Sequence, residues 1–276
     1  MTLPAPNPNP VEEEDEVAAS SAPLLDHLTE LRSRLIVCLA AIAIAFAVCF
    51  LFSKQIFNFL IIPFTEAVKT VNAGEEPTLY FAPLEFFFTQ VRLSVFAAIV
   101  VSFPVLAYQA YGFIAPGLYK REKRAAAPFL IAMPILFAVG ASLVYFVMMP
   151  FIMRFAVGFE AQGEGAGDPA RFELLTRVGD YLSLVTTLIL TFGFSFQLPV
   201  FLTLLARAGM VSAESLVKFR RFAIVGIFVV AAVLTPPDPF SQIVLGLCII
   251  SLYEISVISV RMAERKSKPS TEEVSA

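Results

Sequence analysis

The chain has 276 residues, of which 58% are hydrophobic and only 16% are charged, with 28 Phe and no Trp. Its mean hydropathy is +0.78, whereas soluble domains are usually about 45–50% apolar and about 25% charged. This composition excludes disordered, collagenous and disulfide-scaffold proteins and argues against a soluble core. The net charge of −3 is less informative about a membrane protein than the distribution of Lys and Arg between its loops. The sequence therefore predicts an integral membrane protein.

The 23 residues at the N-terminus alternate Pro with Asn and then carry five consecutive acids, at positions 12–16. They contain neither the basic region nor the apolar region of a secretory signal. We expect residues 1–23 to form a disordered acidic tail, because they cannot bury apolar surface. Residues 262–276, rich in Lys, Glu and Ser, predict a second disordered tail, which leaves 24–261 as the membrane domain.

Between the two tails, six apolar segments predict six membrane-spanning helices, since one crossing needs about 20 apolar residues. The alternating pattern of a membrane barrel is missing from these segments. A long loop is expected between the first segment and the second. The segments are 35–52, 86–113, 125–151, 181–205, 222–234 and 240–260.

Two features of the apolar segments predict a bent bundle. Four prolines lie inside them, and each removes a backbone donor and bends its helix. The fifth segment has only 13 residues, and Glu254 interrupts the sixth. The fifth and sixth helices are therefore expected to be short relative to a hydrocarbon layer of about 30 Å. The prediction is a kinked and concave arrangement, with bends at Pro104, Pro128, Pro134 and Pro199.

Lys and Arg are distributed unequally between the two sets of loops. Fourteen lie on the side of the N-terminus and five on the opposite side. Since cytoplasmic loops are enriched in Lys and Arg, both termini are predicted to be cytoplasmic. The fourteen are Arg32, Arg34, Lys120, Arg121, Lys123, Arg124, Arg207, Lys218, Arg220, Arg221, Arg261, Arg265, Lys266 and Lys268, and the five are Lys54, Lys69, Arg154, Arg171 and Arg177.

Enzyme and metal signatures are absent from the sequence. There is one histidine, His27, and the chain has no HExxH, no GxSxG and no Gly-rich phosphate loop after a strand. The three cysteines, Cys38, Cys49 and Cys248, lie in apolar runs, which is typical of small buried hydrophobic residues. We therefore expect neither an enzyme nor a metal or cofactor site.

Few polar residues lie within the apolar segments. We expect Glu254 to pair with a cytoplasmic cation such as Arg261, and Arg92 to extend its guanidinium to the outer interface. Gln197 needs a hydrogen-bond partner in hydrocarbon. That partner could belong to this chain or to another protein, and the sequence leaves both open.

Two predicted cytoplasmic segments place an acid among cations. In HLTELRSRL (27–35), Glu30 lies beside Arg32 and Arg34, and in GLYKREKR (117–124), Glu122 lies among four cations. Composition alone is equally consistent with solvated loops that contain local ion pairs and with a binding surface.

Five segments together resemble the TatC family, the multispanning core subunit of the twin-arginine protein translocase. They occur in the family's order and cover about residues 24–261. The segments are HLTELRSRL (27–35), SFPVLAYQAYGFIAPGLYKREKR (102–124), FGFSFQLPV (192–200), LTPPDPFSQ (234–242) and LYEISVISVR (252–261).

The resemblance implies a receptor in a bacterial-type cytoplasmic membrane. Proteins of this family bind the Arg-Arg pair of signal peptides on folded cargo at the cytoplasmic face. They assemble with single-span TatA and TatB and with further copies of themselves, and transport uses the proton-motive force. The implied partners are thus signal peptides, Tat subunits and the lipid bilayer, with no nucleic acid and no cofactor.

The resemblance also implies which residues form the sites. The twin-arginine site includes two acids, here Glu30 and Glu122, and guanidinium groups bind carboxylates through two parallel hydrogen bonds. A second group, matched to the cavity and to partner-helix contacts, is Gln197, Pro199 and Asp238. The family often has Glu where this chain has Gln197, which can form hydrogen bonds but cannot titrate. The remaining matches at the twin-arginine site are Arg32, Phe113, Pro116, Leu118, Tyr119, Arg121 and Arg124.

The alternative function is an ion-coupled small-molecule secondary transporter. Such a protein would be expected to show inverted repeats and an ion site near the bilayer midplane, and neither is visible in the sequence. An intramembrane enzyme would need a nucleophile and a base, which are also missing. Binding of an Arg-Arg peptide in preference to its Lys-Lys version would distinguish the three classes.

Overall fold

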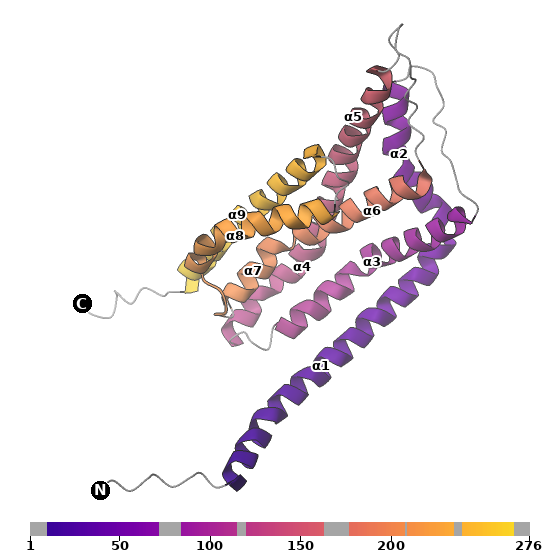
Figure 1. Ribbon diagram of the computed structural model, residues 1–276. Helices are drawn as coiled ribbons and strands as arrows, with labels where there is room; N and C mark the ends of the chain where they lie inside the picture. Colours follow the sequence, from indigo (N-terminus) through magenta and orange to yellow (C-terminus); the bar gives the residue numbers. More distant parts are fainter. Residues whose placement is uncertain are drawn as a thin grey trace, which may run out of the picture.

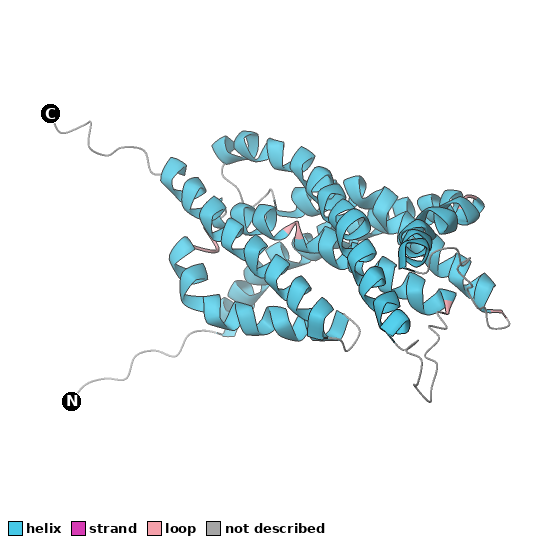
Figure 2. Cartoon of the chain, turned by 90° about the horizontal axis from the view of Figure 1, so that it is seen from above, coloured by secondary structure: helices cyan, strands magenta, loops and turns pink. Residues whose placement is uncertain are grey.

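The computed structural model describes an array of helices (Figures 1 and 2). Its backbone is described for residues 10–71, 84–114, 120–162, 177–207, 209–234 and 239–267, and its side chains for 28–70, 84–113, 129–156, 177–207, 209–233 and 242–264. The helices are α1 (Pro10–Leu51), α2 (Ser53–Val71), α3 (Glu85–Ile114), α4 (Lys120–Leu143), the π-helical turn η2 (Val144–Met148), α5 (Met149–Gln162), α6 (Val178–Ser195), α7 (Leu198–Arg207), α8 (Ala213–Leu234) and α9 (Pro239–Ser267).

Five stretches of the described helices are long and apolar enough to cross a bilayer: Leu28–Leu51, Glu85–Phe113, Phe129–Ala156, Val178–Arg207 and Gln242–Glu264. They correspond to the first four and the sixth of the predicted segments. The fifth segment lies in α8, whose first half carries Lys218, Arg220 and Arg221. A membrane crossing by α8, and with it the count of six, stays a prediction.

Large apolar side chains cover the outside of the bundle. Only 6% of the apolar window of α1 is buried, and Ile44, Phe146 and Val233 are 70%, 69% and 78% exposed. Exposed apolar surface of this extent is unfavourable in water and matches contact with lipid. The fold is that of a multi-pass, all-helical membrane protein.

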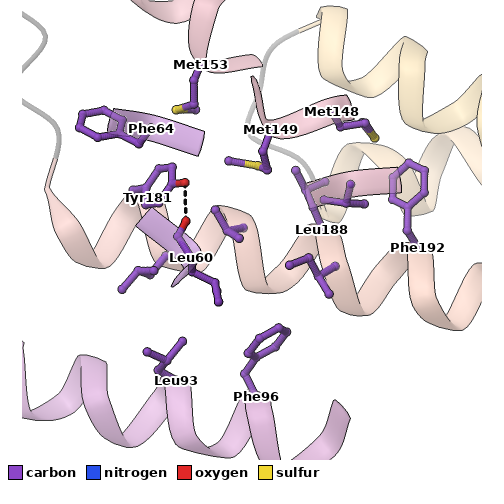
Figure 3. Packing of buried hydrophobic residues seen from close by; sticks show 14 of the residues in the cluster. Leu60, Phe64, Leu93, Phe96, Met148, Met149, Met153, Tyr181, Leu188 and Phe192 are labelled. Carbon is purple, nitrogen blue, oxygen red and sulfur yellow. Dashed lines mark hydrogen bonds between the residues drawn. The ribbon is translucent and has the colours of Figure 1, made fainter. Parts of the chain in front are cut away.

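The structure corrects the loop predicted after the first segment, because α2 occupies the first half of that interval. Leu60, Phe64 and Ala67 lie on one face of α2, at i, i+4 and i+7, and are almost fully buried in the main core cluster (Figure 3). That cluster also includes side chains of α3, η2, α5 and α6. The helical periodicity was present in the sequence, but the loop was predicted from Asn72, Gly74 and Pro77, which all follow the end of α2.

Pro63 lies inside α2, and two tyrosines donate hydrogen bonds to backbone carbonyls in the turn before it. A proline has no N–H, so the carbonyl of Phe59, four residues earlier, lacks its helical donor. The Tyr145 hydroxyl donates to that carbonyl at 2.7 Å, and its ring stacks on Phe59 at 4.5 Å. The Tyr181 hydroxyl donates to the next carbonyl, that of Leu60, at 2.8 Å (Figure 3).

We expect Tyr145→Phe to lower the free energy of unfolding by about 1–2 kcal/mol, because a carbonyl outside water then has no donor. Thermal unfolding of the purified protein in detergent measures this as a lower Tm. Tyr108→Phe is the control, since Tyr108 is 56% exposed on α3. An unchanged Tm for Tyr145→Phe would contradict this role.

The helices at both ends of the chain extend beyond the predicted apolar segments. The backbone of α1 begins at Pro10, so the helix continues into the stretch for which the sequence predicts disorder. Side chains before residue 28 lie outside the described part, and the tail boundaries stay predictions. The prediction that the sixth helix is short is wrong, because α9 continues through Glu254 and has 29 residues.

Candidate functional site

The helices α3, α7 and α9 end and α8 begins at one end of the bundle (Figure 1), and Lys and Arg residues of α7, α8 and α9 lie in these turns. We call this end the basic end. One pocket there is lined by Arg207, Lys218 and Arg261 together with Glu214 and Glu264. The Glu264 carboxylate accepts a hydrogen bond from the Ala213 amide at the start of α8, at 2.9 Å. This bond fixes the end of α9 against α8.

Glu30 also lies at the basic end, where α1 packs against α3. The Arg34 guanidinium donates to Oε1 of Glu30 from Nε at 3.0 Å and from Nη2 at 2.6 Å. Its Nη1 donates to Oε1 of Gln109, on α3, at 3.3 Å. The spacing of four residues places Glu30 and Arg34 on one face of α1. Arg34 therefore connects the acid of α1 to α3.

Gly112 provides space for this guanidinium. A Cβ at position 112 would overlap Nη1 of Arg34 and lie 2.9 Å from its Cζ. A larger residue at position 112 would displace the Arg34 side chain. Glycine thus allows the Arg34 guanidinium to lie against α3.

The structure brings some of the predicted twin-arginine residues to the basic end and leaves others undescribed. Arg32 is exposed on α1, two residues after Glu30, and Phe113 is half-buried near the end of α3. The backbone of α4 includes Arg121, Glu122 and Arg124, whose side chains lie outside the described residues, as do Pro116, Leu118, Tyr119 and Asp238.

Sequence reasoning missed Gln109 and Gly112 and gave Arg34 no role beyond a local charge. The four-residue spacing of Glu30 and Arg34 was a readable signal for their ion pair. The contact with Gln109 crosses 75 residues and had no signal in a single sequence.

Gln197 lies at the break between α6 and α7. Its backbone N–H donates to the Phe194 carbonyl at 3.0 Å, which leaves the Gly193 carbonyl without its usual helical donor. The side-chain Nε2 donates to Gly193 at 3.3 Å and to the Met133 carbonyl of α4 at 3.0 Å. Its Oε1 is buried and has no partner among the described residues. The nitrogen thus bonds within the chain, one of the two readings that the sequence left open.

Two apolar grooves flank α7. Pro199 and Thr203 line a groove of about 780 Å³ between α4, α7 and α9. The other, of about 740 Å³, separates α6 and α7 from α8 and α9 and includes Phe194 and Leu198. Gln197 is not among the lining residues of either groove.

Glu254 pairs with Arg220 of α8, at 2.8 Å, and not with Arg261 as predicted. The pair joins α8 to α9, as does the Tyr253 hydroxyl, which donates to the Leu216 carbonyl at 2.8 Å. In the part of the chain that is described, no three His, Cys, Asp or Glu residues are grouped so that they could hold a metal ion.

The sequence matches the family model of TatC, the Sec-independent protein translocase protein, over residues 26–247. The chain belongs to the TatC family. It is 44% identical over 245 residues to the TatC protein of Magnetococcus marinus, covering 89% of this chain and 86% of that protein. It is 36% identical over 248 residues to TatC of Escherichia coli K12, covering 89% and 91%.

The fold also matches solved TatC structures. A crystal structure of the twin arginine translocase receptor TatC superposes with a TM-score of 0.73 at 33% identity, covering 87% of this chain and 100% of that one. A second structure, of TatC in DDM, gives a TM-score of 0.71 at 33% identity, covering 84% and 98%. The protein is thus a multi-pass component of a Sec-independent translocase, a transport subunit and not an enzyme.

Proposed function

We propose that the chain is the receptor subunit of a twin-arginine translocase and that its basic end binds the Arg-Arg pair of signal peptides on folded cargo. The observation that carries this proposal is the Glu30 carboxylate. Among the described residues, the hydrogen bonds that it accepts all end on Oε1. Since an ionised carboxylate offers acceptor sites on two oxygens, Oε2 can accept an incoming guanidinium.

The proposed second acid, Glu122, lies on α4, which follows α3 after a short connection. The Arg34–Gln109 hydrogen bond places Glu30 beside the last turns of α3, close in the chain to the start of α4. Two carboxylates at one end of the bundle would suit two adjacent arginines. Each guanidinium can form a charge-assisted pair that lysine, a single-point donor, does not reproduce.

The distribution of charge supports a cytoplasmic location for the basic end and an inner-membrane location for the protein, because positive loops remain on the cytoplasmic side. The two grooves beside α7 would accept single-span helices of TatA and TatB type. Further copies of the chain would complete the receptor complex, and the proton-motive force would drive transport.

Direct binding tests the proposal. The full chain in lipid nanodiscs should bind an Arg-Arg signal peptide at least about tenfold more tightly than the Lys-Lys version, the equivalent of one lost charge-assisted hydrogen bond. Fluorescence anisotropy of labelled peptides measures both affinities. Equal affinities would overturn the proposal and favour the alternative of a secondary transporter.

Cysteine labelling tests the orientation. Single cysteines at Asn72 and Gly163, in a background without the three native cysteines, should react with a membrane-impermeant maleimide added to intact cells. A cysteine at Ser270 should react only after the cells are opened. Labelling of Ser270→Cys in intact cells would place the C-terminus outside and reverse the topology.

A further inference from the structure

We propose that Arg34 is the positioning residue of the twin-arginine site: it holds the Glu30 carboxylate by one oxygen and thereby orients the other for the incoming guanidinium. This inference rests on the proposed function, because it gives Arg34 a role in the same site. Arg34 itself does not contact the signal peptide in this scheme.

The geometry of the ion pair carries the inference. Two donors of Arg34, Nε and Nη2, converge on the single atom Oε1 of Glu30. In the usual two-oxygen pairing, a guanidinium occupies both carboxylate oxygens. Here one arginine of the chain occupies one oxygen, so the same carboxylate can accept a second guanidinium without losing the first.

Arg34 is fixed on its other side as well. Nη1 donates to Gln109, and the guanidinium occupies the space that Gly112 leaves on α3. Contacts with two helices limit its rotamers, and through Oε1 they limit the rotamers of Glu30. The acid is therefore ordered before the peptide arrives.

Stability alone does not account for this arrangement. The side chains of Arg34 and Glu30 are 25% and 35% exposed, and pairs of this type at i and i+4 contribute little to folding. Ordering a side chain before binding, in contrast, improves affinity by about two- to tenfold. The arrangement is thus expected to affect binding more than folding.

Charge repulsion alone predicts the opposite change in peptide affinity when Arg34 is removed. Arg34 is a cation next to a site for cations, so a purely repulsive role means that removing it should tighten binding of a positively charged peptide. If Arg34 positions Glu30, removing it should weaken binding and reduce the preference for arginine over lysine. The direction of the change distinguishes the two roles.

The test uses the full chain in nanodiscs of phosphatidylethanolamine and phosphatidylglycerol, with labelled Arg-Arg and Lys-Lys signal peptides. Arg34→Gln removes the charge, whereas Gly112→Ala displaces the guanidinium and leaves every charge in place. We expect each variant to bind the Arg-Arg peptide about two- to tenfold more weakly, with much less change for the Lys-Lys peptide. Arg34→Lys keeps the charge but replaces the three donor nitrogens that bind Glu30 and Gln109 with a single one, so it should also reduce the preference for arginine over lysine.

Matched controls are available in the same chain. Lys54→Gln removes an exposed cation at the start of α2, away from the basic end, and Gly226→Ala adds a Cβ where nothing lies within 4 Å; both should bind as the parent does. Tighter binding by Arg34→Gln, or unchanged selectivity in both Arg34→Gln and Gly112→Ala, would overturn the inference.

A Glu30→Gln variant in the same assay separates this inference from the proposed function. If Glu30→Gln loses the arginine preference while the Arg34 and Gly112 variants keep it, only the positioning role fails. If Glu30→Gln also keeps the preference, the twin-arginine site itself is not at Glu30 and both fail.

Discussion

A chain in which Glu30 and Glu122 are both replaced by alanine is expected to lose about a hundredfold or more in affinity for an Arg-Arg signal peptide. One charge-assisted hydrogen bond contributes about 1.5–3 kcal/mol, so each acid alone should account for roughly ten- to a hundredfold. The estimate requires partial shielding from water, since a fully solvated pair contributes less than about 1 kcal/mol. Glu30 meets that condition, with a side chain 35% exposed.

The measurement is peptide affinity in nanodiscs, together with cargo export and the amount of the variant in the membrane. Export should stop while membrane insertion remains normal. Glu122→Asp should retain more binding than Glu122→Gln, because charge matters more here than length. Glu66→Ala, which removes an exposed acid of α2 away from the basic end, is the control and should bind like the parent. A double variant that still prefers Arg-Arg to Lys-Lys as strongly as the parent would show that these acids do not recognise the pair.

The membrane helices were predictable because their signal is compositional. A run of about 20 apolar residues is the length needed to cross a bilayer, and the segments at 86–113 and 181–205 coincide closely with the spans of the structure.

The break between α6 and α7 was less predictable. Pro199 indicated a bend, but the turn itself lies at Phe196 and Gln197. Its hydrogen bonds depend on a carbonyl of α4, which a local pattern cannot identify.

The ion-pair partners of the glutamates also show that a single sequence predicts local contacts better than contacts between helices. For Glu254, the sequence suggested Arg261, a near neighbour in the chain, although seven residues along a helix separate two side chains by about 10 Å. The partner in the structure is Arg220, across a helix pair whose register a single sequence does not give. At Glu30, in contrast, the partner is four residues away, and the helical repeat alone predicts the contact.

The largest expected effect on stability comes from the packing of α4 against α6. Two glycines allow these helices to approach closely, as small residues commonly do between membrane helices. A Cβ at Gly193 would lie 2.5–2.8 Å from the ring of Phe137, and one at Gly140 would lie 2.9 Å from the Phe192 carbonyl. Phe137 and Phe192 are nearly inaccessible, at 3% and 0% exposed, so neither can move aside easily.

Gly193→Leu is therefore expected to lower the free energy of unfolding by about 3 kcal/mol, the upper part of the range for overpacked cores. Thermal unfolding in detergent and the yield of folded protein measure the effect. Gly226→Leu, which adds the same side chain to a surface with nothing within 4 Å, should unfold like the parent. Combining Gly193→Leu with Phe137→Ala should cost less than the two changes added together, because the alanine removes the ring that the leucine would meet. Strict additivity would mean that the two side chains do not compete for the same space and that the α4–α6 contact differs from the one described.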